Sequence, residues 1–243
     1  MKKTNALRRL GAAAAAAMAA LMAASPANAA LVFDTPSGST TTGGSVDAVA
    51  NFALGSGAVT LTLQNLLQNP MADSQLISAI TFEITLATGS GASTANSGLI
   101  STISSGGAYT AGQQDSLGHW TLTEAGTTIS LTTLSGGQPN RLIIGPDSAG
   151  GFTQQGSYNN ANPSIINHNP SVLGSATFDL TIPGVTAASQ ISDVAVQFGT
   201  TAGANTIDMI SAVPEPGTTL AGLFLLLPFA ASTVRTSRRW RAR

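Results

Sequence analysis

The sequence predicts an all-β fold, an antiparallel β-sandwich or jelly-roll-like domain, over residues 30–212 of a chain of 243 residues. Three observations predict this fold. Apolar and polar residues alternate in short runs, which places successive side chains on opposite faces of a strand. Clusters of Gly, Pro, Ser and Asn separate these runs, as turns do between strands. No convincing helical period extends over about ten residues, so short antiparallel strands account for the region best.

The alternating runs give the expected strands in chain order. Val59, Leu61 and Leu63 show the pattern most clearly, because Thr residues separate them. In the run over residues 80–86, Leu86 is the last residue expected to point inward. By the same reasoning, strands with one buried face are expected in residues 46–54, 58–64, 80–86, 120–122, 129–131, 176–182, 194–198 and 207–209.

Two long segments do not show the strand pattern. Residues 66–76 are the best helical candidate, but Pro70 interrupts them, so we expect a loop with at most one short turn. Residues 145–171 form the longest segment without alternation. Because connections longer than about 15 residues are usually functional or disordered, a binding surface is expected first in this segment.

Residues 1–29 have the three parts of a secretory signal peptide. Basic residues come first, an alanine-rich apolar stretch follows, and the small residues Ala27 and Ala29 fit the specificity of signal peptidase. We therefore expect cleavage before Ala30 and export of the rest of the chain. A retained membrane anchor is the alternative, although the apolar stretch is short for a span of about 20 residues.

The domain between the two ends is acidic. Ten Asp and Glu residues stand against Arg141 alone, which leaves a formal charge of −9 for residues 30–212. Nucleic acid is therefore not expected as a partner, because phosphate binding requires clustered Lys or Arg. The chain also has no cysteine, so disulfides and thiolate metal sites are excluded.

The domain shows no recognisable catalytic motif. It lacks a Gly-x-Ser-x-Gly pentad, and its two histidines, His119 and His168, are far apart in sequence. Glu83 and Glu124 are its only glutamates, and Glu83 alternates with core residues, so a glycosidase pair is not expected. We expect no enzyme, cofactor or metal, with a secreted hydrolase as the alternative. For an incidental calcium site, Asp147 is the first residue to test.

Carbohydrate binding is a stronger alternative for the domain, because β-sandwiches can present aromatic rings to sugars. The sequence offers few such rings. Trp120 shares a face with Leu122 and is expected in the core. Tyr158 lies in the long polar segment between Gly-Ser and Asn-Asn pairs, which makes it the better candidate for contact with a ligand such as an exopolysaccharide.

The C-terminal region has the composition of a single membrane anchor. Residues 218–234 form an uncharged run of 17 residues, about 25 Å of helix, which is at the short limit for a transmembrane span. Pro214 and Pro216 keep Glu215 in an extended stretch before this helix. By the positive-inside rule, the tail is expected to stay cytoplasmic through Arg235, Arg238, Arg239, Arg241 and Arg243.

Residues 213–243 resemble a PEP-CTERM sorting signal. The resemblance rests on Val213-Pro214-Glu215-Pro216-Gly217, then one short apolar span and an arginine-rich end, in a chain that also begins with a signal peptide. It does not extend to the domain. An ordinary tail anchor with a proline cap is the alternative.

The resemblance implies a substrate of a membrane-embedded exosortase in a Gram-negative bacterium. It implies processing near the Pro-Glu-Pro motif, which releases residues 30–212 to the outer surface or extracellular matrix. The expected partners are therefore signal peptidase, an exosortase and, through the matrix, exopolysaccharide. We expect the domain to have a structural or adhesive role there, with a carbohydrate-binding module as the first alternative.

Overall fold

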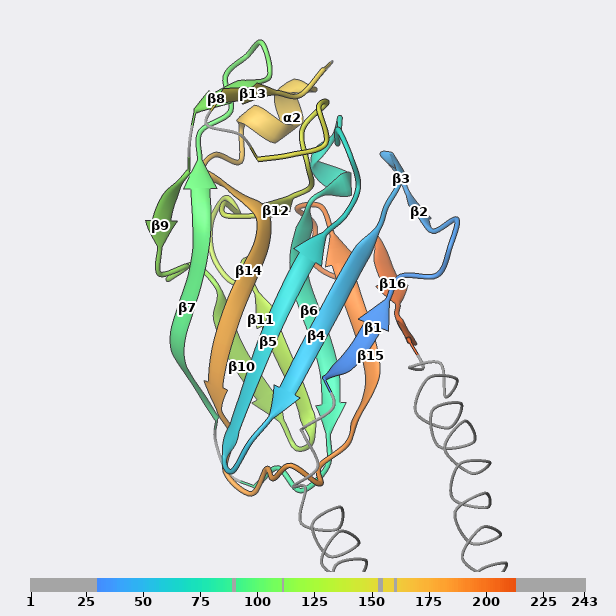
Figure 1. Cartoon of the computed structure of the whole chain (residues 1–243), viewed down its shortest axis with the longest axis vertical. Coiled ribbons are helices and arrows are strands. Elements are labelled where there is room, and N and C mark those ends of the chain that lie inside the picture. Colours follow the sequence, from blue (N-terminus) through green and yellow to red (C-terminus); the bar gives the residue numbers. More distant parts are fainter. Residues whose placement is uncertain (1–29, 89–90, 111, 153–154, 160, 213–243) are drawn as a thin grey trace, which may run out of the picture. The chain divides into compact units, whose positions relative to one another are not determined.

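The computed structural model describes residues 30–88, 91–110, 112–152, 155–159 and 161–212, and these residues form an all-β fold (Figure 1). Two short helical segments accompany the strands, η1 (Asp73–Gln75) and α2 (Pro163–Ile166). The strands are β1 (Leu31–Asp34), β2 (Thr40–Thr41), β3 (Gly44–Ser45), β4 (Ala48–Leu54), β5 (Ala58–Asn65), β6 (Ile77–Ile84), β7 (Ala92–Ser101), β8 (Ala108–Thr110), β9 (Gln113–Asp115), β10 (Thr121–Ala125), β11 (Thr128–Thr132), β12 (Ile143–Ile144), β13 (Gln155–Ser157), β14 (Ser171–Thr181), β15 (Ile191–Phe198), β16 (Thr206–Asp208) and β17 (Ile210–Ser211).

One layer of the fold has the strand order β9-β7-β14-β5-β4-β1-β17, and each neighbouring pair from β9 to β1 is antiparallel. The registers place core residues opposite each other, as in the pairs of Leu61 with Phe52 on β4 and with Phe178 on β14. Because strand residues alternate between faces, the intervening threonines point outward. The alternation read from the sequence therefore predicted this layer correctly for β4, β5 and β14.

The second layer has the order β10-β11-β6-β15-β16, again with antiparallel pairs, and lies behind the first in Figure 1. The short strand β12 joins the two layers at one end. Its residue Ile143 pairs antiparallel with Ile77 of β6 and parallel with Val172 of β14. This bridge holds the two layers together at the end where the long loops emerge.

The main core fills the space between the layers. The ring of Phe52 on β4 contacts that of Phe82 on β6, with centroids 4.9 Å apart. The ring of Trp120 packs on Phe178 of β14 at 5.0 Å. These contacts cross from one layer to the other, so the aromatic side chains stabilise the packing of the two sheets. Trp120 is only 3% exposed, which confirms its predicted place in the core.

The strand predictions were wrong at Leu86, and they missed several strands, including β1 and β7. Leu86 was expected to point inward, but β6 ends at Ile84 and Leu86 is 57% exposed. Leu86 adopts a left-handed backbone conformation with φ of 67°, and this turn takes its side chain off the core face. Alternation does not reveal β7, because its sequence is rich in Ala, Ser and Gly. The loop expected at residues 66–76 is confirmed, with η1 as its single short turn.

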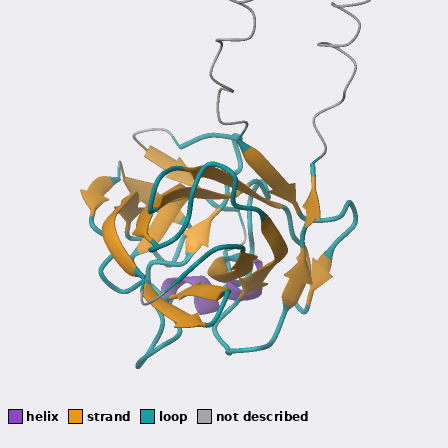
Figure 2. Cartoon of the chain, turned by 90° about the horizontal axis from the view of Figure 1, so that it is seen from below, coloured by secondary structure: helices purple, strands orange, loops and turns teal. Residues whose placement is uncertain are grey.

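A second, smaller core lies at the end of the sandwich where β8, β13 and α2 are found (Figure 1). We call β8, β13, α2 and residues 102–107 the cap. The helical segments occupy one small region of a domain that otherwise consists of strands and loops (Figure 2). The cap core is formed by Leu76, Ile103, Tyr109, Leu142, Ile144, Tyr158, Ile165 and Leu173.

Most of the predicted export signals lie outside the described residues. These are the signal peptide with Ala27 and Ala29, the motif Val213-Pro214-Glu215-Pro216-Gly217, the span 218–234 and the arginines from Arg235 to Arg243. Ala30, the expected first residue of the exported chain, is described and exposed. Among the described residues, no helix has the length and apolar character needed to cross a membrane.

Candidate functional site

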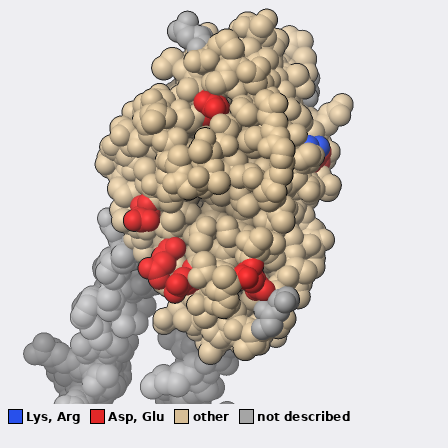
Figure 3. Space-filling view, turned by 180° about the vertical axis from the view of Figure 1, so that it is seen from behind, with Lys and Arg blue, Asp and Glu red and all other residues tan. Residues whose placement is uncertain are grey.

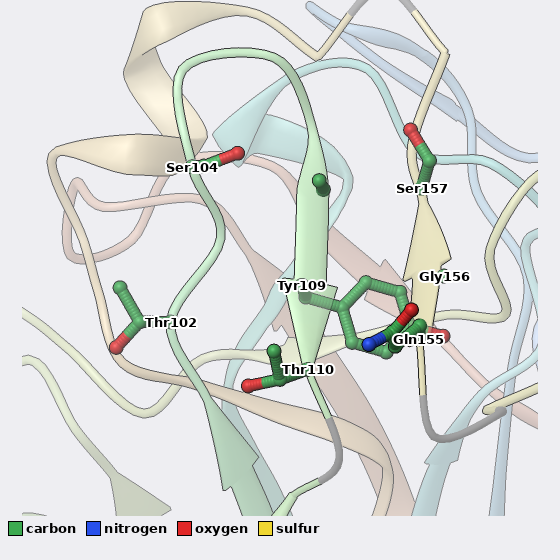
Figure 4. A pocket seen from close by; sticks show the side chains of 8 residues that line it. Thr102, Ser104, Tyr109, Thr110, Gln155, Gly156 and Ser157 are labelled. Carbon is green, nitrogen blue, oxygen red and sulfur yellow. The ribbon is translucent and has the colours of Figure 1, made fainter.

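The cap contains an open groove with a volume of about 670 Å³. Figure 4 shows how three chain segments form it, with residues 102–104, β8 and β13 running beside one another. A volume of this size is within the range of ligand sites, about 300–1,000 Å³. The lining residues are Thr102, Ser104, Ala108, Tyr109, Thr110, Gln155, Gly156 and Ser157.

The groove rests on a two-stranded ribbon of β8 and β13. Tyr109 pairs with Gly156, and Thr110 pairs with Gln155. Because neighbouring residues point to opposite faces, Tyr109 turns into the cap while Thr110 and Gln155 stay exposed. The ribbon therefore presents polar side chains to solvent and an aromatic ring to the cap core.

The inner face of the ribbon is fixed by a buried hydrogen-bond network around Asp147. The Tyr109 hydroxyl donates to Oδ2 of Asp147 at 2.9 Å. The backbone N–H groups of Ala149 and Gly151 donate to Oδ1 at 2.9 and 3.2 Å. Gly156 is required beside this network, because a Cβ atom at that position would collide with the Asp147 carboxylate and the Tyr109 hydroxyl.

Tyr158 does not present its ring to a ligand, which corrects the expectation from the sequence. Its side chain is completely buried, its ring packs on Tyr109 with centroids 5.4 Å apart, and its hydroxyl donates to the carbonyl of Gly145 at 3.0 Å. Burial raises the pKa of the Tyr158 phenol well above its ordinary range, and the nearby Tyr109 and Asp147 act in the same direction. Tyr158 is a core residue of the cap.

Asp147, named from the sequence as the first residue to test for an incidental calcium site, is not available at the surface. The residue is 1% exposed, and both of its carboxylate oxygens already accept hydrogen bonds from the protein. Its role is to organise the loop that follows β12. In the described part of the chain, no three His, Asp or Glu side chains gather in a way that could hold a metal ion.

The wall of the groove at residues 102–104 is held from behind by one side chain. The amide of Asn169 accepts a hydrogen bond from the Ile103 N–H at 2.9 Å and donates to the Ile103 carbonyl at 2.8 Å. Ile103 itself is buried in the cap core. Asn169 thus satisfies a buried backbone position in the way that a neighbouring strand does.

Charges are sparse on the domain and absent from the outer lining of the groove. In the view from behind, acidic residues form separate patches on a largely uncharged surface (Figure 3). Arg141, the single basic residue of the domain, forms a two-point ion pair with Asp115 at 2.9 and 3.0 Å. The Arg141 guanidinium, together with the Leu117 N–H, lowers the pKa of the Asp115 carboxyl despite partial desolvation.

The other candidate residues are not brought together. Glu83 pairs with Thr128 while Glu124 pairs with buried Ile129, so the two glutamates lie on opposite faces of one layer. His119 is exposed, whereas the Nδ1 atom of His168 lies 2.7 Å from the carbonyl of Pro139. A second pocket of about 540 Å³ includes Asp34 and Asp47 as its ionisable lining residues.

No known protein family matches the chain, and comparisons with curated proteins and with solved structures gave no significant match. Sequence reasoning placed a binding surface in residues 145–171, and β13 in this segment does line the groove. Thr102, Ser104 and Thr110 were not predicted, because single hydroxyl residues in a loop or in a strand of three residues carry no periodic signal.

Proposed function

We propose that this protein is exported and sorted to the cell envelope or extracellular matrix of a Gram-negative bacterium, where the β domain has a structural or adhesive role. One observation carries the proposal. The described strands run from Leu31 to Ser211, and the two predicted signals lie on either side of them. Cleavage before Ala30 and near Pro214-Glu215-Pro216 removes none of these strands.

The outer faces of both layers carry many hydroxyl side chains, which is consistent with the proposed location outside the cytoplasm. On the outer face of the first layer, the Thr60 hydroxyl donates to Asp179 at 2.8 Å, and the hydroxyls of Thr62 and Thr177 lie 3.5 Å apart. On the second layer, the Thr81 hydroxyl donates to Ser130 at 3.2 Å. Rows of short hydroxyl side chains hydrate the sheet with few charges, which favours contact with uncharged hydrated polymers.

In this proposal, residues 218–234 anchor the exported chain only transiently. The five arginines after the span remain cytoplasmic, and Glu215 is presented to an exosortase outside the inner membrane. The prolines on either side of Glu215 keep the backbone extended, because they do not fit the interior of a helix. Processing then frees the β domain from the membrane.

Intact-mass analysis of the protein from cells with and without exosortase tests the proposal. We expect the released form to end near Pro214-Glu215-Pro216 only when the exosortase is present, and to begin at Ala30 in both strains. Replacing Pro214 and Pro216 by Ala should prevent release, whereas Pro183→Ala, in an exposed turn of the domain, should not. Retention of the residues after Pro216 in both strains would refute sorting.

A further inference from the structure

We propose that the groove of the cap binds a neutral oligosaccharide through the hydroxyl groups of Thr102, Ser104 and Thr110. These three residues are exposed and line the groove from two segments. Within the described residues, their hydroxyls form no hydrogen bond with the protein. Each hydroxyl both donates and accepts, which matches the hydroxyl groups of a sugar ring.

The lining favours an uncharged ligand. The exposed lining side chains are Thr, Ser, Ala and Gln, none of which carries a charge. The nearest carboxylate, Asp147, lies beneath the ribbon, where Tyr109 and two backbone N–H groups saturate it. A phosphate or a uronate would find no cation in this lining to offset its desolvation, so binding of such anions is disfavoured.

The backbone around the groove disfavours a peptide that binds by strand addition. β8 pairs with β13 along one edge. Along its other edge, the Ala108 carbonyl accepts from the Ser104 N–H at 2.9 Å and the Thr110 carbonyl accepts from the Ser101 hydroxyl at 2.8 Å. These bonds engage the two carbonyls on this edge of β8, so a peptide that added as a strand would have to displace them. The hydroxyls of Thr102, Ser104 and Thr110, in contrast, face a ligand without such competition.

The residues that line the groove are held in place by the cap core and by Asn169. The Asn169 amide fixes Ile103 between Thr102 and Ser104, and the cap core lies under both strands of the ribbon. A polar surface that is ordered before binding loses less conformational entropy when the ligand arrives.

Affinity electrophoresis of the full-length chain in mild detergent tests the proposal. The gels contain dextran, glucomannan, galactomannan or xyloglucan as neutral polysaccharides, and alginate as an anionic one. We expect retardation in at least one neutral gel. Added salt at about 0.5 M, several-fold above physiological ionic strength, screens charges and should leave this retardation unchanged. In the double variant Thr102→Ala/Thr110→Ala, the apparent affinity calculated from the retardation should fall by about tenfold or more.

A matched control keeps the test falsifiable. Thr123→Ala/Thr206→Ala removes two exposed threonines from β10 and β16, which lie in the second layer away from the groove. This variant should be retarded like the wild type, and both double variants should keep the wild-type melting temperature within a few degrees. Retardation confined to alginate, no retardation in any neutral gel, or equal binding by the two variants would overturn the proposal.

The proposal does not depend on sorting by an exosortase. Binding is measured on the purified chain, whereas sorting is measured by the mass of the protein from cells. A chain that is processed but binds no neutral polysaccharide refutes only the inference about the groove. A chain that binds but is never processed refutes only the proposed sorting.

Discussion

The hydroxyl group of Tyr109 donates a hydrogen bond of 2.9 Å to the Asp147 carboxylate, and both side chains are almost completely buried. This bond joins the ribbon of β8 and β13 to the loop after β12. The inner face of the groove therefore depends on one phenol and one carboxylate, neither of which contacts solvent appreciably. Their removal tests how the cap is stabilised.

Replacing Tyr109 by Phe should lower the free energy of unfolding by about 1.5–3 kcal/mol, because a buried carboxylate loses a donor. Tyr158→Phe is the comparison, since that hydroxyl donates to the neutral carbonyl of Gly145. Its loss should cost about 0.5–1.5 kcal/mol. Urea denaturation at pH 7 measures both values, and the reverse order would contradict the role assigned to Asp147.

Gly156→Ala should destabilise the cap by about 1–3 kcal/mol, because the added methyl group overpacks the space beside Asp147 and Tyr109. Gly106→Ala is the matched control, since a Cβ atom there meets nothing within 4 Å. Thermal unfolding compares the two variants. Equal melting temperatures would show that the close approach of β13 to Tyr109 is not required.

Asn169→Ala should accelerate amide hydrogen exchange at Ile103 by about tenfold or more, because the N–H loses its acceptor in a buried position. Asn51→Ala, on the outer face of β4, removes the same amide group from a partly exposed position and should leave Ile103 unchanged. Exchange measured by NMR decides the matter. Unchanged protection of Ile103 in Asn169→Ala would mean that another group holds the groove wall.

Because of the ion pair between Asp115 and Arg141, the free energy of unfolding should fall at acidic pH. The pKa of Asp115 is lower in the folded protein than its ordinary value of 3.8, so the unfolded chain takes up a proton first as the pH falls. Its contribution is complete above the unfolded pKa and is lost as the pH falls through the folded pKa. The difference in the free energy of unfolding between wild type and Asp115→Asn should therefore be constant from about pH 5 to 7. It should shrink below about pH 4.

Asp208→Asn is the control for that measurement, because it removes an exposed carboxylate that has no ion-pair partner among the described residues. Urea denaturation across the pH range gives both differences. A wild-type advantage over Asp115→Asn that grows toward low pH would contradict the assignment of the ion pair.

Phe82→Ala should cost about 3–5 kcal/mol, because it leaves a cavity where the two layers meet at Phe52. Leu86→Ala should change stability by less than about 1 kcal/mol, since the Leu86 side chain is mostly exposed. The comparison by chemical denaturation separates the correct part of the prediction for this strand from the incorrect part. A large loss in Leu86→Ala would mean that the side chain packs on the core after all.

Alternation predicted strands well where one face is buried by large residues. Val59, Leu61 and Leu63 are at most 1% exposed, as their spacing indicated. β7 escaped detection because its small side chains bury little apolar area, and its pairing with β14 depends on backbone hydrogen bonds rather than on a pattern. Leu86 continued the alternation by chance, since the strand had already ended at Ile84.

The groove could not be predicted in the same way. The cap core draws Leu76, Ile103 and Tyr158 from distant parts of the chain, and no local period links them. Polar neighbours made Tyr158 look exposed, although its burial is decided by the Tyr109 ring and the Gly145 carbonyl. One signal was readable: Asn162 before Pro163 is a helix-capping pair, and Asn162 does accept from the Ser164 N–H at the start of α2.

Arg141 determines how the domain responds to trypsin-like proteases. Enzymes of the trypsin type cut after Lys or Arg, and residues 30–212 offer them a single bond, between Arg141 and Leu142. That bond is poorly placed for attack, because the Arg141 carbonyl accepts from the Trp120 indole at 3.0 Å and Leu142 is wholly buried. While it stays folded, the domain withholds its one tryptic site from digestion.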